Sequence, residues 1–511
     1  MFTQVYSGGI YGVEGFLVSV EADVSDGLPG FYITGQPSSE VKESQDRVRT
    51  AMKNSGFRLT AKKITVNLSP AGIRKGGTAF DLPMAVAVLG GFSLEDTSQL
   101  KDSMIIGELG LDGQVKPVSG VLPLVMEAKR CGLKRCFLPK ENVREGKVVE
   151  GLQMIGVETL KQMVGMLQNP EQLVAYRDEE PWTLREAKED YDVDFSEVRG
   201  QLAARRAAEV ASAGMHGLML NGSAGTGKTM IAKRLPTILP SLTREEDIEI
   251  SKVYSICGLL PKGKPLLSRR PFRSPHHTIS PQGLTGGGMV PHPGELSLAS
   301  GGVLFLDELP LFSKAALEAL RQPLEERRVT IGRVAGSYEF PADFMIVAAL
   351  NPCPCGFYPD RSRCHCSEQQ VRAYLSRISR PILDRFDICA EISPVTFEQL
   401  GQGAKKGESS AVIRKRIEKA RIIQQKRFQG TKIRFNSRMG AKEIKQYCSL
   451  GKEETSFAAR VYKARNLSVR GYYKVLKVSR TIADLEGQEQ IRTEHLAEAF
   501  GYRTLEETLW G

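Results

Sequence analysis

The sequence predicts an α/β protein built around a nucleotide-binding sheet, and three observations favour this fold class. Short β-branched runs alternate with stretches of helical periodicity along most of the chain. The glycine-rich turn 222–229 lies between an apolar run and a helix-compatible segment, and a second apolar run, 302–306, ends in two carboxylates. The segments that follow parallel strands meet at the carboxyl edge of the sheet, where open α/β sheets bind ligands.

The 511 residues divide into four segments of different character. Residues 1–168 mix β-branched runs with helical stretches and glycine turns, which predicts an α+β domain. Residues 169–196 carry two prolines and a run of carboxylates, and we interpret them as an acidic linker. Residues 197–400 form the second α/β region, and residues 401–511 are helical and basic, as expected of a lid domain.

The charge is concentrated at one end of the chain. The formal net charge is +11, and residues 401–511 carry 24 Lys and Arg against 12 Asp and Glu, so the other 400 residues sum to −1. A basic C-terminal region favours a polyanionic partner, although a lid with a solvated basic face would carry the same charge. The residues expected on this surface are Arg414, Lys415, Arg416, Lys419, Lys426 and Arg427.

Several classes of protein are excluded by composition. No run approaches the roughly 20 consecutive apolar residues of a membrane span, and the N-terminus lacks the basic and apolar regions of a signal peptide. We therefore expect a cytoplasmic protein with no membrane partner. Nine cysteines, an odd number, do not suggest a disulfide framework, and a reducing cytosol would keep them as thiols.

The turn 222–229 has the G-x-x-x-x-G-K-[ST] pattern of a P-loop between a strand and a helix. Its glycines let backbone N–H groups converge on phosphates, Lys228 would reach the β- and γ-phosphates, and the Thr229 hydroxyl would ligate Mg²⁺. The residues expected to bind ATP are Gly222, Ser223, Ala224, Gly225, Thr226, Gly227, Lys228 and Thr229.

Three side chains are expected to complete the reaction centre. Asp307 and Glu308 follow a buried strand, so Asp307 would hold Mg²⁺ through water and Glu308 would polarise the attacking water. Asn351 follows the apolar run 345–350 and would lie beside them if the two strands are neighbours. A turn asparagine before Pro352 is the alternative interpretation.

With these motifs and four others, the chain resembles AAA+ ATPases of the magnesium-chelatase-related group, and most closely the ComM/YifB family, over nearly its whole length. The resemblance implies a AAA+ P-loop NTPase core with a helical lid. It also implies that Asn351 is a sensor, Arg385 an arginine finger for a neighbouring subunit, and Arg470 a second sensor. The other motifs are residues 270–280, 349–356, 381–387 and 467–471.

Arg385 lies between Asp384 and Asp387, so an internal ion pair competes with the finger role. A finger must stay available for a γ-phosphate, where it increases the rate by about 10³–10⁵-fold. In this architecture Arg385 does not readily reach the nucleotide at the P-loop of its own subunit, so catalysis implies a ring of subunits. The resemblance implies that this ring is a homohexamer.

Two inserts distinguish this chain from a minimal AAA+ core. Residues 269–294 are rich in Arg, His, Pro and Gly, and residues 326–341 have the pattern of a hairpin. In the family both project into the central pore, which would make their arginines sequence-independent phosphate contacts. An arginine-laced, solvated hairpin is the alternative. The expected DNA contacts are Arg273, Arg327, Arg328 and Arg333.

Four cysteines, at 353, 355, 364 and 366, lie within one short segment. Cys353, Cys355, Cys364 and Cys366 could close a tetrahedral structural zinc site. The C-x-C spacing departs from the usual C-x₂₋₄-C, and His365 adds a competing ligand.

Residues 1–168 resemble the Lon-protease-like domain, of the ribosomal S5 domain 2-like fold, that is attached to several DNA motors. The motifs are residues 76–81, 107–114 and 117–120. A Ser-Lys protease needs a nucleophile and an amine base, and the matching positions hold Thr78 and the apolar Leu122. We therefore expect a scaffold or DNA-binding ring without peptidase activity.

The resemblance implies an ATP-dependent hexameric DNA translocase or helicase that promotes branch migration when incoming DNA recombines during natural transformation. Its cofactors would be ATP and Mg²⁺, with a structural Zn²⁺ if the cysteine cluster binds one. Its partners would be single-stranded and branched DNA, and recombination proteins could be further partners. The alternative is a magnesium-chelatase-type motor that remodels a protein partner. A third hypothesis, a nucleotide-regulated binding module, is disfavoured by the complete set of catalytic residues.

Overall fold

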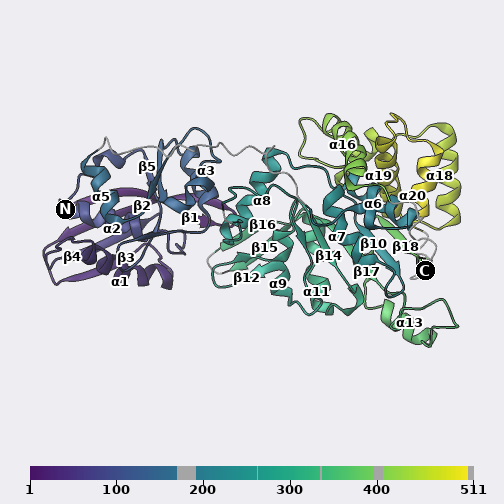
Figure 1. Ribbon diagram of the computed structural model, residues 1–511, viewed down its shortest axis with the longest axis horizontal. Helices are drawn as coiled ribbons and strands as arrows, with labels where there is room; N and C mark the ends of the chain where they lie inside the picture. Colours follow the sequence, from purple (N-terminus) through teal and green to yellow (C-terminus); the bar gives the residue numbers. More distant parts are fainter. Residues whose placement is uncertain (170–190, 262, 334–335, 396–406, 504–511) are drawn as a thin grey trace.

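The computed structural model of the chain describes residues 1–169, 191–261, 263–333, 336–395 and 407–503. An N-terminal domain, an ATPase core and a helical lid follow one another along the long axis (Figure 1). The predicted acidic linker, 169–196, falls mostly outside the described residues. Within the described residues, no helix has the length and apolarity that crossing a membrane requires.

The N-terminal domain is an α+β fold on a mixed sheet of seven strands in the order β3-β4-β2-β1-β5-β8-β9. The long strands β1 and β2 pair antiparallel in an alternating pattern of burial, and α2 is buried on all sides against them. The strands are β1 (Phe2–Tyr11), β2 (Glu14–Ser25), β3 (Gly30–Thr34), β4 (Lys63–Ser69), β5 (Ser103–Ile105), β8 (Arg135–Pro139) and β9 (Gln153–Val157), beside a ribbon of β6 (Glu108–Leu109) and β7 (Val115–Lys116). The helices are α1 (Ser39–Asn54), α2 (Asp81–Gly91), α3 (Val121–Arg130), α4 (Val143–Gly146) and α5 (Leu160–Gln168).

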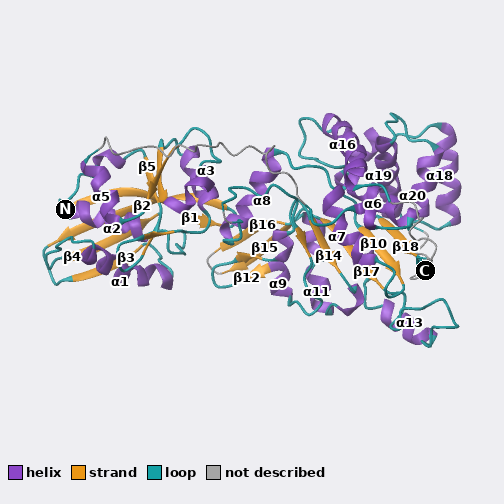
Figure 2. Ribbon diagram, in the orientation of Figure 1, coloured by secondary structure: helices purple, strands orange, loops and turns teal. Residues whose placement is uncertain are grey.

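The ATPase core is a parallel sheet of five strands in the order β11-β14-β17-β10-β18 (Figure 2). Its three central strands are continuous buried runs, as expected for a sheet covered on both faces. The strands are β10 (Leu218–Gly222), β11 (Phe272–Arg273), β14 (Val303–Leu306), β17 (Met345–Leu350) and β18 (Ile388–Ile392). The helices are α6 (Leu202–Gly214), α7 (Lys228–Ile238), α8 (Arg244–Ile256), α11 (Lys314–Ala319), α12 (Arg321–Glu326), α13 (Glu368–Leu375) and α14 (Arg380–Leu383).

Both inserts form small ordered units that contact each other. The first carries α9 (Pro281–Thr285) and the ribbon of β12 (Gly286–Gly287) and β13 (His292–Pro293), and α10 (Glu295–Leu298) follows it. The second is the antiparallel hairpin of β15 (Arg328–Arg333) and β16 (Gly336–Pro341). Arg333 Nε donates to Gly288 O at 3.1 Å, so the end of β15 lies against the ribbon of the first insert.

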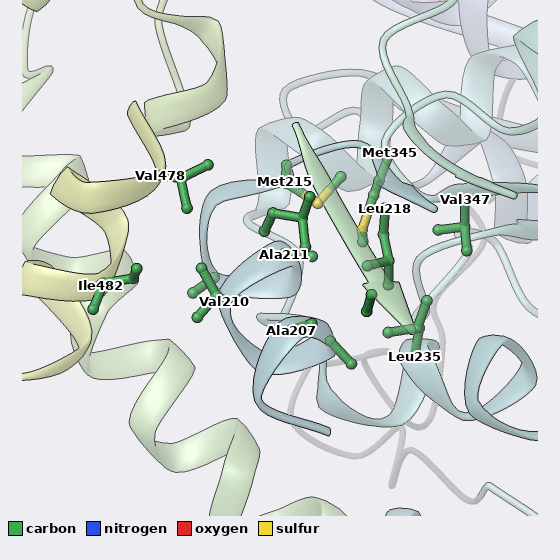
Figure 3. Close-up of a cluster of buried hydrophobic side chains, with 14 of the residues drawn as sticks. Ala207, Val210, Ala211, Met215, Leu218, Leu235, Met345, Val347, Val478 and Ile482 are labelled. Atoms are coloured by element: carbon green, nitrogen blue, oxygen red, sulfur yellow. The ribbon is translucent and has the colours of Figure 1, made fainter. Parts of the chain in front are cut away.

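The lid shares one hydrophobic core with the sheet. Figure 3 shows Val478 and Ile482 of the lid facing Val210 and Ala211 of α6, and Leu218 of β10 belongs to the same buried cluster. The lid helices are α16 (Ser410–Arg427), α17 (Ala441–Tyr447), α18 (Lys452–Ala464), α19 (Val469–Leu485) and α20 (Thr493–Gly501).

Half of the predicted basic surface on the lid is occupied by protein partners. Arg414 Nε donates to Thr237 O at 2.9 Å, Arg416 pairs with Glu209 and Glu408, and Arg427 pairs with buried Asp484. These guanidinium groups fix the lid and so contribute less to an exposed basic face than the sequence predicts.

The N-terminal domain contacts the ATPase core beside the second insert (Figure 1). The turn between β1 and β2 places the Tyr11 ring 4.5 Å from the Tyr338 ring of β16, and Tyr11 Oη donates to Ser337 O at 2.8 Å. Gly12 has φ +64°, and a Cβ there would lie 3.0 Å from Glu339 O. The close approach of the two backbones therefore requires glycine.

Candidate nucleotide site

The P-loop connects buried β10 to α7 at the carboxyl edge of the sheet. Gly225 and Gly227 have φ of +78° and +93°, a backbone conformation that only glycine adopts readily. A Cβ on Gly222 would lie 2.4 Å from Ile392 O of the neighbouring strand. The glycines thus permit the turn at two positions and close strand packing at a third.

Lys228 lies inside the loop that it follows. Its ammonium donates to Gly222 O and Ser223 O, both at 2.7 Å, and to Asn351 Oδ1 at 2.9 Å. Burial lowers the pKa of Lys228, and the carboxylates Asp307 and Glu308 oppose that shift. The three hydrogen bonds fix the Lys228 ammonium within the loop that is expected to bind phosphates.

The sheet order brings the predicted carboxylates and Asn351 to the P-loop. Since β14, β17 and β10 are neighbours in a parallel sheet, the residues that follow them share one edge. Thr229 Oγ1 donates to Asp307 Oδ2 at 2.9 Å, a pair of hard oxygen ligands that suits Mg²⁺. Glu308 is exposed and has φ +52°, which turns its side chain out of the strand line.

One neighbour of the centre was missed by the sequence reasoning. His277 Nδ1 lies 3.9 Å from Glu308 Oε2, and its ring packs edge-on against Phe312. His276 and His277 belong to the first insert, and nothing in their spacing indicates the contact with Glu308. The first insert therefore reaches the carboxylate that is expected to polarise water.

Arg385 and Arg470 meet at the opposite edge of the sheet. Arg385 directly precedes the start of β18, where Asp387 N donates to Gly217 O at 2.9 Å, whereas the P-loop follows the other end of β10. Arg385 pairs with Glu325 at 3.1 Å and Arg470 with the same carboxylate at 3.5 Å. Asp387, one of the two ion-pair partners considered from the sequence, instead contacts His216 Nδ1 at 3.0 Å.

The four arginines predicted to contact DNA have different environments. Arg273 forms a bidentate pair with Glu295 at 2.6 and 2.7 Å. Arg327 ends α12 with φ +58° beside Asp343, and burial lowers its pKa to about 10. Arg328 and Arg333 are exposed on the hairpin. Arg328 also pairs with Glu326 at 3.5 Å and with Glu339 at 3.4 Å, so Arg333 is the one of the four that has no carboxylate partner among the described residues.

The four clustered cysteines converge on one point. Their sulfur atoms all lie within 4.8 Å of one another, with Cys353 and Cys364 buried and Cys355 and Cys366 half-buried. His365 is exposed and lies outside this cluster. At the positions considered for a peptidase, Leu122 is fully buried at the start of α3 and Thr78 is half-buried.

The comparisons with known proteins agree with this architecture. The model of magnesium chelatase subunit ChlI matches residues 194–400, with further ChlI models on residues 20–142 and 407–503. Competence protein ComM of Haemophilus influenzae is 40% identical, over 98% of this chain and 97% of its own length. This chain belongs to the ComM/YifB family.

Other relatives are consistent with the family and with a chain that combines a Lon-like domain and a AAA+ domain. YifB of Salmonella typhimurium is 38% identical over 99% of this chain. Lon protease 2 of Bacillus subtilis is 30% identical over 26% of it, a partial similarity. The ComM/YifB family has a magnesium-chelatase-like AAA+ domain, which implies ATPase activity and the use of ATP and Mg²⁺.

Proposed function

We propose that the chain is one subunit of an ATP-driven hexameric ring that translocates on DNA and promotes branch migration. The observation that carries the proposal is the separation of the P-loop from Arg385 and Arg470. A strand of five residues spans about 16 Å, and the two arginines lie at the far end of such a strand from Lys228. This separation supports a ring in which a neighbouring subunit supplies the two arginines to the nucleotide.

In this ring Lys228 and the P-loop amides bind the phosphates, and Thr229 and Asp307 hold Mg²⁺, which neutralises charge on the phosphate oxygens. Glu308 orients the attacking water, and Asn351 positions that water beside Lys228. Arg385 and Arg470 of one subunit, aligned by Glu325, face the γ-phosphate of the next. The ring would act in the cytoplasm, with recombination proteins as partners.

The name of the Haemophilus relative, a competence protein, supports a role in recombination of incoming DNA.

The second candidate is a motor that remodels a protein, and the three matching models of a magnesium chelatase subunit favour it. ATPase assays with single-stranded and forked DNA separate the two. Stimulation by DNA is expected; turnover that DNA leaves unchanged would favour the protein-remodelling motor.

Arg333→Ala is expected to reduce DNA-stimulated ATPase several-fold while basal turnover changes little, because Arg333 is exposed on the hairpin, away from the P-loop. Loss of one phosphate contact should also reduce, by about one, the steepness with which the logarithm of the DNA-binding constant falls with the logarithm of the salt concentration. Arg460→Ala, a change of an exposed arginine on α18, is the matched control. An equal fall of basal and stimulated rates would contradict a pore role for the hairpin.

The cysteine cluster is proposed to hold a structural Zn²⁺. Protein purified without chelator, at neutral pH and with reductant, is expected to contain about one zinc per chain by elemental analysis, as expected for a single closed four-cysteine site. Cys364→Ser should lose the metal. A folded, active protein free of zinc would exclude the site.

A further inference from the structure

The segment that carries the four cysteines also contacts the nucleotide site. It begins at Pro352, directly after Asn351, and ends before α13, below the ATPase sheet in Figure 1. We infer that a divalent metal held by these thiolates braces the P-loop, so that metal loss weakens nucleotide binding. This inference rests on the zinc site proposed above and is independent of DNA translocation.

The sulfur positions suit a tetrahedral thiolate centre. Cys353 Sγ lies 3.3 Å from Cys355 Sγ and 3.8 Å from Cys364 Sγ, and the Cys355 and Cys364 sulfurs are 3.6 Å apart. Zinc–sulfur bonds of about 2.3 Å at tetrahedral angles place sulfur atoms about 3.8 Å apart. The chain therefore holds the ligands close to their metal-bound spacing.

The surroundings of the sulfurs supply the hydrogen bonds and charge that such a centre needs. The Tyr358 N–H donates to Cys353 Sγ at 3.4 Å, the kind of outer contact that orients a ligand. Four thiolates around one Zn²⁺ leave a net charge of −2. Two cations lie in the same segment: Arg361 donates to Cys366 O at 2.9 Å, and the Arg363 guanidinium lies 4.1 Å from the centre of the Phe357 ring.

Gly356 is the point of contact with the P-loop. Its N–H donates to Cys353 O at 3.0 Å, so the residue belongs to the turn that joins the first two ligands. It has φ +83°, and a Cβ there would lie 3.3 Å from Ala224 N and 3.9 Å from Asn351 Cγ. The ligand turn thus lies beside Ala224 of the P-loop and beside Asn351, the partner of Lys228, close enough that one added carbon atom would touch both.

Packing of Cys353 and Cys364 in the core and a few turn hydrogen bonds hold the segment, and the metal would add the remaining constraint. Residues 352–366 contain turns but neither a helix nor a strand, so sheet or helix hydrogen bonds do not hold them in place. A metal that joins ligands at both ends of the segment removes conformational freedom that four separate thiols would retain. Without it, Gly356 would be held less firmly beside Ala224, and ordering the P-loop around phosphate would cost more.

The test uses the full-length protein in the absence of DNA. Bound zinc is measured by elemental analysis and affinity for a fluorescent ATP analogue by anisotropy, before and after removal of metal by a chelator with reductant. We expect nucleotide affinity to fall about tenfold on metal removal and to recover when Zn²⁺ is restored. Cys131→Ser, a change of an exposed thiol in the N-terminal domain, is the control and should alter neither reading.

Gly356→Ala separates the contact from the metal. The variant keeps all four cysteines, so it should retain zinc and show the visible spectrum of a thiolate site with Co²⁺, yet bind nucleotide more weakly. Full nucleotide affinity in the zinc-free protein, or in a zinc-loaded Gly356→Ala protein, would overturn the brace while leaving the zinc site intact. Absence of zinc from the purified protein would instead overturn the site itself.

Discussion

Replacing Arg385 by alanine is expected to lower ATP turnover by about 10³-fold or more while ATP affinity changes little. The arginine lies at the sheet edge opposite Lys228, so its removal leaves the subunit's own phosphate site intact. Steady-state ATPase and nucleotide-binding assays on the full chain measure the two effects. Arg321→Ala, on the same helix as Glu325 but paired with Glu318, is the matched control and should turn over normally.

A mixing experiment tests whether Arg385 acts across an interface. Arg385→Ala subunits keep Glu308, and Glu308→Gln subunits keep Arg385, so a mixed ring contains some interfaces with both groups. Activity should therefore reappear when the two inactive proteins are combined. A wild-type monomer that hydrolyses ATP at the full rate would contradict the assignment of Arg385 to a neighbouring site.

Glu308→Gln is expected to reduce kcat by about 10²–10⁴-fold, the usual effect of losing a general base, with ATP binding retained. Glu308 contacts the Thr229–Asp307 pair through its backbone N–H, which donates to Asp307 Oδ1 at 3.0 Å, so a change of its side chain should leave the proposed phosphate and metal site in place. Single-turnover hydrolysis with Mg²⁺ and ATP measures the loss. The variant should therefore trap the ATP-bound ring.

Glu318→Gln, which removes an exposed carboxylate on α11, is the control for Glu308→Gln and should hydrolyse ATP at the wild-type rate. Retention of more than about a tenth of wild-type kcat by Glu308→Gln would show that another group activates the water. His277 is the residue to examine in that event, since it lies 3.9 Å from the carboxylate.

The sequence predicted the fold class and the family because both depend on local patterns. An apolar strand, a glycine turn and a helix are specified by neighbours along the chain, and φ values of +78° and +93° at Gly225 and Gly227 can be anticipated from the motif. The sequence predicted that Asn351 lies beside Asp307 if the strands before them are neighbours. The order β14-β17-β10 shows that these strands, β17 and β14, are neighbours.

The electrostatic partners of the arginines could not be predicted in the same way. Arg273 is bound by Glu295, 22 residues away, and Arg385 by Glu325, 60 residues away. Each pairing depends on which elements the sheet places side by side. The sequence alone does not show whether these arginines pair with a carboxylate or bind a phosphate. Charge composition therefore overstated the basic surface of the lid as well, where Arg416 and Arg427 are paired.

The P-loop, the Asp-Glu strand end, the cysteine cluster and the family can all be identified without a structure, since each is encoded by residues close together in the chain. Three features depend instead on the tertiary fold: Arg385 and Arg470 share Glu325 away from the P-loop, His277 approaches Glu308, and Gly356 lies beside Ala224. The physical reason is common to all three. Residues that precede a strand and residues that follow it lie at opposite edges of the sheet. Contacts between segments that are distant in the sequence form only when the elements pack together.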